Sequence, residues 1–120
     1  MNINEWSQEI HKNAVEHGWW EKPKPISEVT MLCTCELAEA VEEARAGRPI
    51  MYVDDIEELN RITDIKQFDG RKPEGVAVEM ADCLFRVLDW FGSENIDVEQ
   101  VMKLKHEYNK TRPYKHGKKF

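Results

Sequence analysis

The segment from Val76 to Phe91, VAVEMADCLFRVLDWF, restricts the fold more than any other part of the chain. At helical spacing its apolar side chains point in nearly every direction, and a helix of this kind is normally buried on most sides. Its polar residues follow one another at spacings of three, four and three, which places them on one charged stripe of Glu79, Asp82, Arg86 and Asp89. We therefore expect an enclosed helix that carries a charged stripe.

A charged stripe on an enclosed helix has to be compensated, because burying a lone carboxylate costs several kcal/mol or shifts its pKa until it is neutral. Arg86 can form a ladder of ion pairs with Asp82 and Asp89 on its own helix. Alternatively, Glu79 and Asp82 can hold a cation, or the stripe can face water on a partly exposed helix. Judged on this helix alone, the ladder is favoured.

The segment from Ser27 to Ala46 predicts another helix, which stops at Gly47 with Pro49 beyond it. One face of this helix is apolar and consists of Cys33, Leu37, Ala40, Val41 and Ala44. A separate acidic ridge consists of Glu36, Glu39 and Glu43 and is preceded by the apolar Val29 and Leu32. The acidic residues thus begin where the ridge of an otherwise enclosed helix turns from apolar to charged.

Each of these two helices carries a pair of carboxylates at spacing i, i+3, namely Glu36 with Glu39 and Glu79 with Asp82. If the pairs face each other, the four carboxylates repel strongly unless a cation lies between them. An all-oxygen site of this kind suits Mg²⁺ or Mn²⁺. Di-iron bundles use Glu-x-x-His on two of their helices, so the pattern here favours magnesium over iron.

Helices are also expected at both ends of the chain, which makes the fold class all-α. Asn2 with Glu5 has the capping-box pattern for a first helix that ends near Gly18. Asp97 begins a last helix that continues to about Lys110. At 120 residues the chain suits a single domain, which we take to be residues 1–120.

The third helix is expected from about Glu74 to Gly92, and a long connection precedes it. Residues 49–73 have no sustained period, so we expect an irregular insertion between the second and third helices, with the length typical of functional loops. Within it, DDIEELN is compatible with a short helix and IMYV with a short strand. Residues 111–120 form a basic tail.

Composition excludes several classes of protein. Charged residues make up 33% of the chain and the net charge is -6, which argues against nonspecific nucleic-acid binding over the whole surface. No apolar run approaches the ~18 residues of a membrane helix. The first ten residues, MNINEWSQEI, lack the features of a signal peptide, and the three cysteines fit reduced thiols without completing a zinc set. We therefore expect a cytoplasmic protein without a membrane partner.

Two further groups of residues are candidates for substrate binding. Lys105, Asn109 and Arg112 share one helical face if the last helix extends that far, and such a face can clamp a polyphosphate. The alternatives are a solvated, frayed terminus or contact with a nucleic-acid backbone. Trp20 is a candidate for stacking on a nucleobase, although both Trp19 and Trp20 also fit core or interface packing.

The chain resembles the MazG-like all-α nucleoside triphosphate pyrophosphohydrolases. The resemblance is carried by ELAEA (Glu36–Ala40), EGVAVEMADCLFRVLDW (Glu74–Trp90) and NID (Asn95–Asp97). NAVEHGWWE (Asn13–Glu21) and KHEYNKTRPYKHGKK (Lys105–Lys119) are similar to a small MazG-like subgroup. Only residues 49–72 lie clearly outside the resemblance.

The resemblance implies a four-helix bundle that works as a homodimer or homotetramer. It implies Mg²⁺-dependent cleavage of ribo- or deoxynucleoside triphosphates between the α and β phosphates, giving a monophosphate and pyrophosphate. The implied catalytic residues and metal ligands are Glu36, Glu39, Glu79 and Asp82. Glu39 and Glu43 are both candidates for the general base. Many relatives have a further glutamate just before the first ligand, and Cys35 at that position leaves the number of metal ions open.

Two other classes of function are compatible with the same residues. One is a helical module that binds a nucleotide or nucleic acid without turnover. The other is an interaction protein whose acidic pairs meet arginines. Metal-dependent cleavage separates the enzyme from both alternatives.

Overall fold

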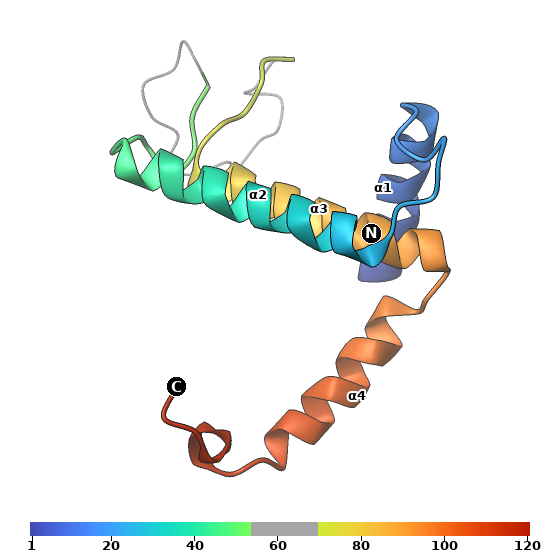
Figure 1. The fold of residues 1–120 in the computed structure, drawn as a ribbon, viewed down its shortest axis with the longest axis vertical. Helices are drawn as coiled ribbons and strands as arrows, with labels where there is room; N and C mark the ends of the chain where they lie inside the picture. Colours follow the sequence, from blue (N-terminus) through green and yellow to red (C-terminus); the bar gives the residue numbers. More distant parts are fainter. Residues whose placement is uncertain (54–69) are drawn as a thin grey trace. The chain divides into compact units, whose positions relative to one another are not determined.

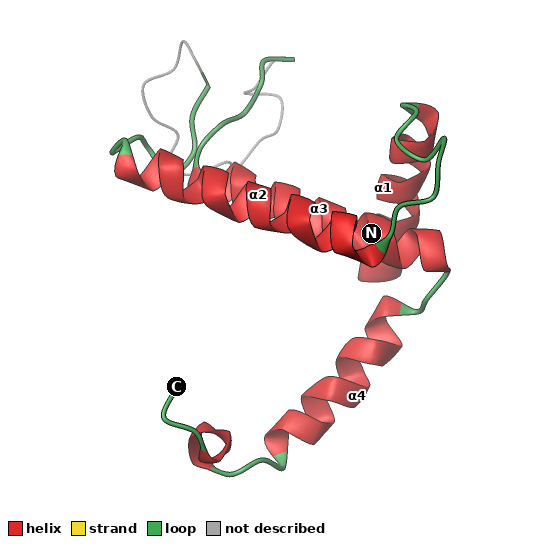
Figure 2. Ribbon diagram, viewed as in Figure 1, coloured by secondary structure: helices red, strands yellow, loops and turns green. Residues whose placement is uncertain are grey.

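The computed structural model describes residues 1–53 and 70–120, and these residues are all-helical (Figure 2). In chain order (Figure 1) the elements are α1 (Ile3–Glu16), α2 (Ile26–Arg45), α3 (Val76–Glu94), α4 (Val98–Lys110) and the 3₁₀-helix η2 (Tyr114–Gly117). The described residues contain no strand, and the expected all-α class is confirmed to that extent. The segment DDIEELN, for which a short helix was considered, lies outside the described residues.

The predicted helix caps at the two ends of the chain are confirmed. The Asn2 side chain accepts a hydrogen bond from the backbone N–H of Glu5 at 2.9 Å, and the Asn2 N–H donates to the Glu5 carboxylate at 3.3 Å. The Asp97 carboxylate accepts a hydrogen bond from the backbone N–H of Gln100 at 3.0 Å. Both caps satisfy N–H groups that have no partner inside their helix.

The C-terminus of α2 has the predicted glycine stop. Gly47 is left-handed with φ 67°, its N–H donates to the Ala44 carbonyl at 3.1 Å, and the Arg48 N–H donates to the Glu43 carbonyl at 3.4 Å. These two bonds form a Schellman motif, which uses carbonyls that the ending helix leaves free. Glycine is favoured here because a Cβ atom disfavours positive φ.

The prediction that Gly92 ends α3 was wrong. The helix continues to Glu94 and closes with a Schellman motif around Asn95, which is left-handed at φ 54°. Gly92 serves instead as a contact point: a Cβ atom there would lie 2.6 Å from the His11 Cβ and 2.9 Å from the Ser7 carbonyl oxygen. The glycine is required by the close approach of α1 rather than by a helix end.

At its N-terminus α3 begins at Val76, two residues later than expected, because the backbone of Glu74 pairs with that of Tyr52. The two residues exchange N–H···O bonds of 2.9 and 2.8 Å in an isolated antiparallel bridge. This bridge takes the place of the short strand considered for IMYV.

The chain divides into two compact units. The first consists of Met1–Gly18 and Leu88–Phe120, and the second of Trp19–Val87. In the first unit the Asn4 side chain donates to Asp97 at 2.9 Å and accepts from the Val98 N–H at 2.8 Å, while the Ser7 hydroxyl donates to the Leu88 carbonyl at 2.7 Å. Polar contacts thus hold α1 to the start of α4 and to the last part of α3.

In the second unit the side chains on α2 are distributed differently from the sequence prediction. The buried residues of α2 are Val29, Glu36 and Ala40, so its buried stripe includes a member of the acidic ridge. Leu37 and Val41, from the expected apolar face, are 43% and 55% exposed. On α3, large apolar side chains are also exposed, namely Met80, Leu84, Phe85 and Val87. The expected enclosure of α3 is therefore not reached within a single chain.

None of the helices among the described residues combines the length and apolarity that crossing a membrane requires.

Candidate metal centre

Three glutamates from two helices meet in the second unit. Glu36 and Glu39 on α2 and Glu79 on α3 each offer a carboxylate oxygen, and these three oxygens lie within 4.8 Å of one another. Glu36 is buried, Glu79 is half-buried and Glu39 is exposed. The i, i+3 spacing on α2 places both of its glutamates toward Glu79. We refer to these three residues as the glutamate cluster.

The Glu79 carboxyl is the most perturbed group of the cluster. Its pKa is raised from 4.5 to about 7, first by burial, and then by a hydrogen bond and the negative charge of Glu39 together with the charges of Asp82 and Glu36. Its Oε2 atom is buried and accepts no hydrogen bond from the residues that the structure describes. A buried acceptor without a donor is costly, and a cation is one group that can satisfy it.

Asp82, the fourth predicted ligand, lies outside the glutamate cluster, but the charges of Glu36 and Glu39 affect the pKa of its carboxyl. Burial raises the pKa of its carboxyl, the charges of Glu36 and Glu39 raise it further, and the Arg86 guanidinium opposes them. The side chain is half-buried. The four predicted ligands therefore form a group of three with a neighbouring fourth carboxylate.

Arg86 pairs with a partner that the ladder prediction did not include. Its Nε donates to Oε1 of Glu36 across the two helices at 2.6 Å, and the Glu36 side chain is only 10% exposed. Such a charge-assisted bond is among the stronger polar contacts in proteins. It also matches, for this one glutamate, the alternative in which acidic pairs meet arginines.

Asp89, the last residue of the charged stripe, belongs to the first unit and lies near His11 on α1. The Nδ1 atom of His11 lies 2.8 Å from the Asp89 carboxylate. The sequence spacing had given no indication of a role for His11, because its partner is far away along the chain. Two members of the charged stripe, Arg86 and Asp89, thus contact residues of other helices.

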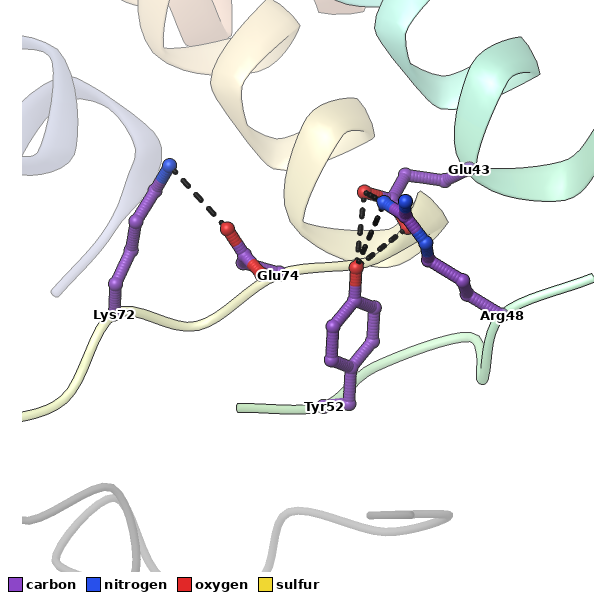
Figure 3. Close-up of polar contacts among 5 residues, drawn as sticks. All are labelled: Glu43, Arg48, Tyr52, Lys72 and Glu74. Carbon is purple, nitrogen blue, oxygen red and sulfur yellow. Dashed lines mark hydrogen bonds and ion pairs between the residues drawn. The ribbon is translucent and has the colours of Figure 1, made fainter. Parts of the chain in front are cut away.

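Glu43, one of the two candidate general bases, is held in a separate network at the end of α2 (Figure 3). The Tyr52 hydroxyl donates to its carboxylate at 2.9 and 3.1 Å, and Arg48 Nη1 donates to the same carboxylate at 3.1 Å. Lys72 and Glu74 form a further ion pair nearby at 3.5 Å. Through its bonds with Tyr52 and Arg48, the Glu43 carboxylate anchors the chain that leaves α2.

The predicted polyphosphate clamp lies in the first unit. α4 ends at Lys110, so the helical face predicted to include Arg112 does not extend that far. Lys105 and Arg112 nevertheless come together on Tyr108: the Lys105 ammonium lies 5.1 Å and the Arg112 guanidinium 5.8 Å from the centre of its ring. Asn109 is half-buried, and its Oδ1 is buried without a hydrogen bond from the described residues.

Trp20, the candidate for base stacking, is half-buried in the second unit. The Lys24 ammonium lies 4.6 Å from the centre of its ring and 5.9 Å from that of Trp19. Trp19 is 67% exposed. The structure therefore presents Trp19 to solvent more fully than Trp20.

Comparisons with protein-family models, curated proteins and solved structures found no match to this chain.

Proposed function

We propose that this chain is a Mg²⁺-dependent nucleoside triphosphate pyrophosphohydrolase of the MazG-like type, which cleaves ribo- or deoxynucleoside triphosphates between the α and β phosphates. The observation that carries the proposal is the meeting of Glu36, Glu39 and Glu79 within 4.8 Å. The buried and unpartnered Oε2 of Glu79 supports it, because such an atom fits a hard cation.

The residues available to hold Mg²⁺, or Mn²⁺ in its place, are those of the glutamate cluster, with Asp82 beside them. A cation bound there would neutralise negative charge on the phosphate oxygens of the substrate. An all-carboxylate set without histidine or cysteine favours such a hard cation over zinc or iron.

The protein side chains have separate roles in this proposal. Arg86 restrains Glu36 through their 2.6 Å bond and keeps it directed into the site. Glu39 is the exposed member of the cluster, and we assign to it the acceptance of a proton from the water that attacks phosphorus. Pyrophosphate then leaves, and the nucleoside monophosphate remains. Glu43 is not assigned as the base, because its carboxylate already accepts hydrogen bonds from Tyr52 and Arg48.

Substrate recognition is assigned to the remaining candidate residues. Lys105 and Arg112 carry positive charge around the Tyr108 ring and are suited to a polyphosphate, and Asn109 lies between them in the sequence, on α4. Trp20 remains the proposed base-stacking residue. Because Lys105 and Arg112 are assigned to the triphosphate, the proposal includes no nucleic-acid partner.

The proposal includes a MazG-like four-helix bundle as the fold of the chain and the assembly of chains into a homodimer or homotetramer. The exposed Leu37 and Val41 on α2, with Met80 and Leu84 on α3, support it, because such apolar faces are normally covered. A second copy of the chain supplies a matching apolar face by symmetry.

Product analysis tests the reaction. The wild type and Glu79→Gln are incubated with a panel of ribo- and deoxynucleoside triphosphates, with and without Mg²⁺. We expect monophosphate and pyrophosphate only with the metal, and a loss of about 100-fold or more in kcat/KM for Glu79→Gln. Glu42→Gln is the matched control, because Glu42 lies on α2 but is exposed and outside the glutamate cluster. Absence of product from every triphosphate would refute the proposal.

The Arg86–Glu36 bond favours one alternative, an interaction protein in which the acidic residues meet arginine. That function predicts that Mg²⁺ changes neither the melting temperature nor the products. A binding module without turnover predicts nucleotide binding by calorimetry in the absence of any product.

A further inference from the structure

The chain that leaves α2 and the chain that enters α3 each present a cation beside the bridge between Tyr52 and Glu74 (Figure 3). Arg48 precedes Tyr52 by four residues, and its side chain is 55% exposed. Lys72 precedes Glu74 by two residues, and its side chain is 83% exposed. The bridge therefore brings two exposed cations to the same end of α2 and α3. We refer to Arg48 and Lys72 as the cationic rim.

Arg48 is fixed to the residue that follows the glutamate cluster on the acidic ridge of α2. Its Nη1 donates to the Glu43 carboxylate at 3.1 Å, and the Glu43 side chain is only 12% exposed. Glu43 follows Glu39 by four residues, a spacing that places two helical side chains about 5–6 Å apart at their Cβ atoms. The guanidinium is thus held about one helical turn beyond the cluster.

Lys72 approaches the same site from the start of α3. Its ammonium lies 3.5 Å from the Glu74 carboxylate, and the carbonyl of the next residue, Gly75, accepts the Glu79 N–H at 3.1 Å. Glu79 therefore lies in the first turn of the helix that Lys72 precedes. Burial is the main cause that raises the pKa of the Asp82 carboxyl, and the charge of Lys72 is among the effects that oppose it.

Both cations keep donors for a ligand. Among the described residues the Arg48 guanidinium bonds only through Nη1, to Glu43 and, at 3.3 Å, to the Tyr52 hydroxyl, so Nε and Nη2 are not used. The Lys72 ammonium has three donors and contacts one carboxylate within the same part of the chain. A guanidinium matches the geometry of a phosphate with its fork, and an ammonium acts as a point charge.

The electrostatics of the glutamate cluster require such cations if the site is to receive a polyphosphate. When ionised, the cluster and Asp82 carry more negative charge than Arg86 and one divalent cation neutralise. The remainder would repel a substrate that is itself an anion. On the other side of the cluster the ridge of α2 is apolar, with Val29 buried and Leu32 half-buried. The phosphate chain therefore fits the side of the cationic rim.

We propose that Arg48 and Lys72 bind the β- and γ-phosphates of the nucleoside triphosphate, which leave together as pyrophosphate. This assignment rests on the proposed function and adds a direction to it: the α-phosphate lies at the glutamate cluster, and the nucleoside lies toward the N-terminal part of α2. Positive charge beside the leaving phosphates stabilises the charge that they gain when the α–β anhydride bond breaks. The assignment does not depend on Lys105 or Arg112, which belong to the other unit.

Isothermal calorimetry of the full chain with inorganic pyrophosphate, at a fixed free Mg²⁺ concentration, tests the assignment. We expect Arg48→Gln and Lys72→Gln each to weaken pyrophosphate binding about tenfold, and Arg48→Lys to weaken it less. Binding of the nucleoside monophosphate should change by less than about twofold, because the α-phosphate lies away from the cationic rim. A purely structural role would affect both ligands alike.

Two further variants separate the charge of the rim from the network that holds it. Tyr52→Phe removes the hydroxyl that bonds to Glu43 and Arg48 but keeps both cations, so pyrophosphate binding should stay within about twofold of wild type. Arg45→Gln is the matched control, because Arg45 is an exposed arginine two residues from Glu43, on another side of α2. It should bind pyrophosphate like wild type.

The outcomes distinguish this assignment from the proposed reaction. Equal pyrophosphate binding by wild type, Arg48→Gln and Lys72→Gln would overturn the assignment, whereas product formation by wild type would leave the proposed function intact. A loss in Tyr52→Phe as large as in Arg48→Gln would also overturn it. Binding that depends on both cations in a chain that forms no product would refute the reaction and support the phosphate-binding role. Because Lys72 is 83% exposed, Lys72→Gln gives the answer even if Arg48→Gln fails to fold.

Discussion

At the scale of single residues, Glu79 combines burial with three neighbouring carboxylates. In the metal-free protein its folded-state pKa is about 7, against an ordinary value of 4.5. Between these values the folded state holds more protons than the unfolded state, so the free energy of unfolding falls as pH rises. The loss is complete above about pH 7 and absent below the ordinary pKa.

Glu79→Gln removes this penalty. In the presence of a chelator we expect the variant to melt about 4 °C above wild type at pH 8, and at the same temperature near pH 4. Thermal denaturation across this range measures the difference, with Glu42→Gln as the control that should follow wild type. A variant that melts below wild type at pH 8 would contradict the assigned burial cost. Because the same variant is expected to lose activity, its stability separates lost chemistry from lost folding.

Arg86 gives a second prediction at this scale. Removal of its guanidinium leaves the buried Glu36 carboxylate without its 2.6 Å partner. We expect Arg86→Gln to lower the free energy of unfolding by about 2 kcal/mol in urea titrations, with a smaller loss for Arg86→Lys.

Lys103→Gln is the control for Arg86. Lys103 pairs with Glu99 at 3.5 Å on the exposed surface of α4, and such pairs contribute little. Equal stability of Arg86→Gln and Lys103→Gln would show that the Arg86–Glu36 bond does not stabilise the fold.

The sequence predicted the glutamate cluster because its members follow helical spacing on two helices. It did not predict the partners of the stripe, since Arg86 meets Glu36 and Asp89 meets His11 across large separations in the chain. Spacing defines which residues share a face, whereas the packing of helices decides which faces meet.

At the scale of elements, helix ends with local signals were predictable. Asn2, Asp97 and Gly47 act through bonds to residues a few positions away. The sequence did not predict the role of Gly92, because that role comes from the close contact with α1. The sequence alone does not distinguish a glycine that ends a helix from a glycine that allows another helix to pack closely.

Gly75 provides the prediction at this scale. Its φ is +119°, and a Cβ atom would lie 2.5 Å from the Ile50 carbonyl oxygen. That carbonyl accepts the Ala77 N–H at 3.0 Å at the start of α3. We expect Gly75→Ala to cost about 3 kcal/mol of stability, because backbone atoms have to move.

Gly47→Ala is the matched control, since Gly47 also has positive φ but has open space around its Cβ position. Its cost should be about 1 kcal/mol. Urea denaturation of both variants measures the difference, and equal costs would mean that the contact with Ile50 relaxes easily.

At the scale of the whole molecule, the exposed apolar side chains of α2 and α3 support association of the chain with itself. Leu84 is 59% and Met80 49% exposed on α3. An aspartate there would place a charge in the proposed apolar interface, so Leu84→Asp should shift the mass measured by light scattering to the monomer value of 14.1 kDa.

Val15→Asp is the control, because Val15 is similarly exposed at 49% but lies on α1 in the other unit. Wild type that is already monomeric at high concentration would contradict self-association. The sequence predicted that these helices are covered on most sides, but it could not reveal that one chain leaves those faces open.

The bridge between Tyr52 and Glu74 has a consequence for engineering of the chain. It joins the two sides of the connection close to the helices, and Tyr52 is also fixed to Glu43 at the end of α2. These contacts tie the end of α2 directly to the residue that precedes Gly75 and α3. Since doubling the length of a closed loop costs only about 0.6 kcal/mol, this connection is a suitable position for grafting a peptide tag or reporter.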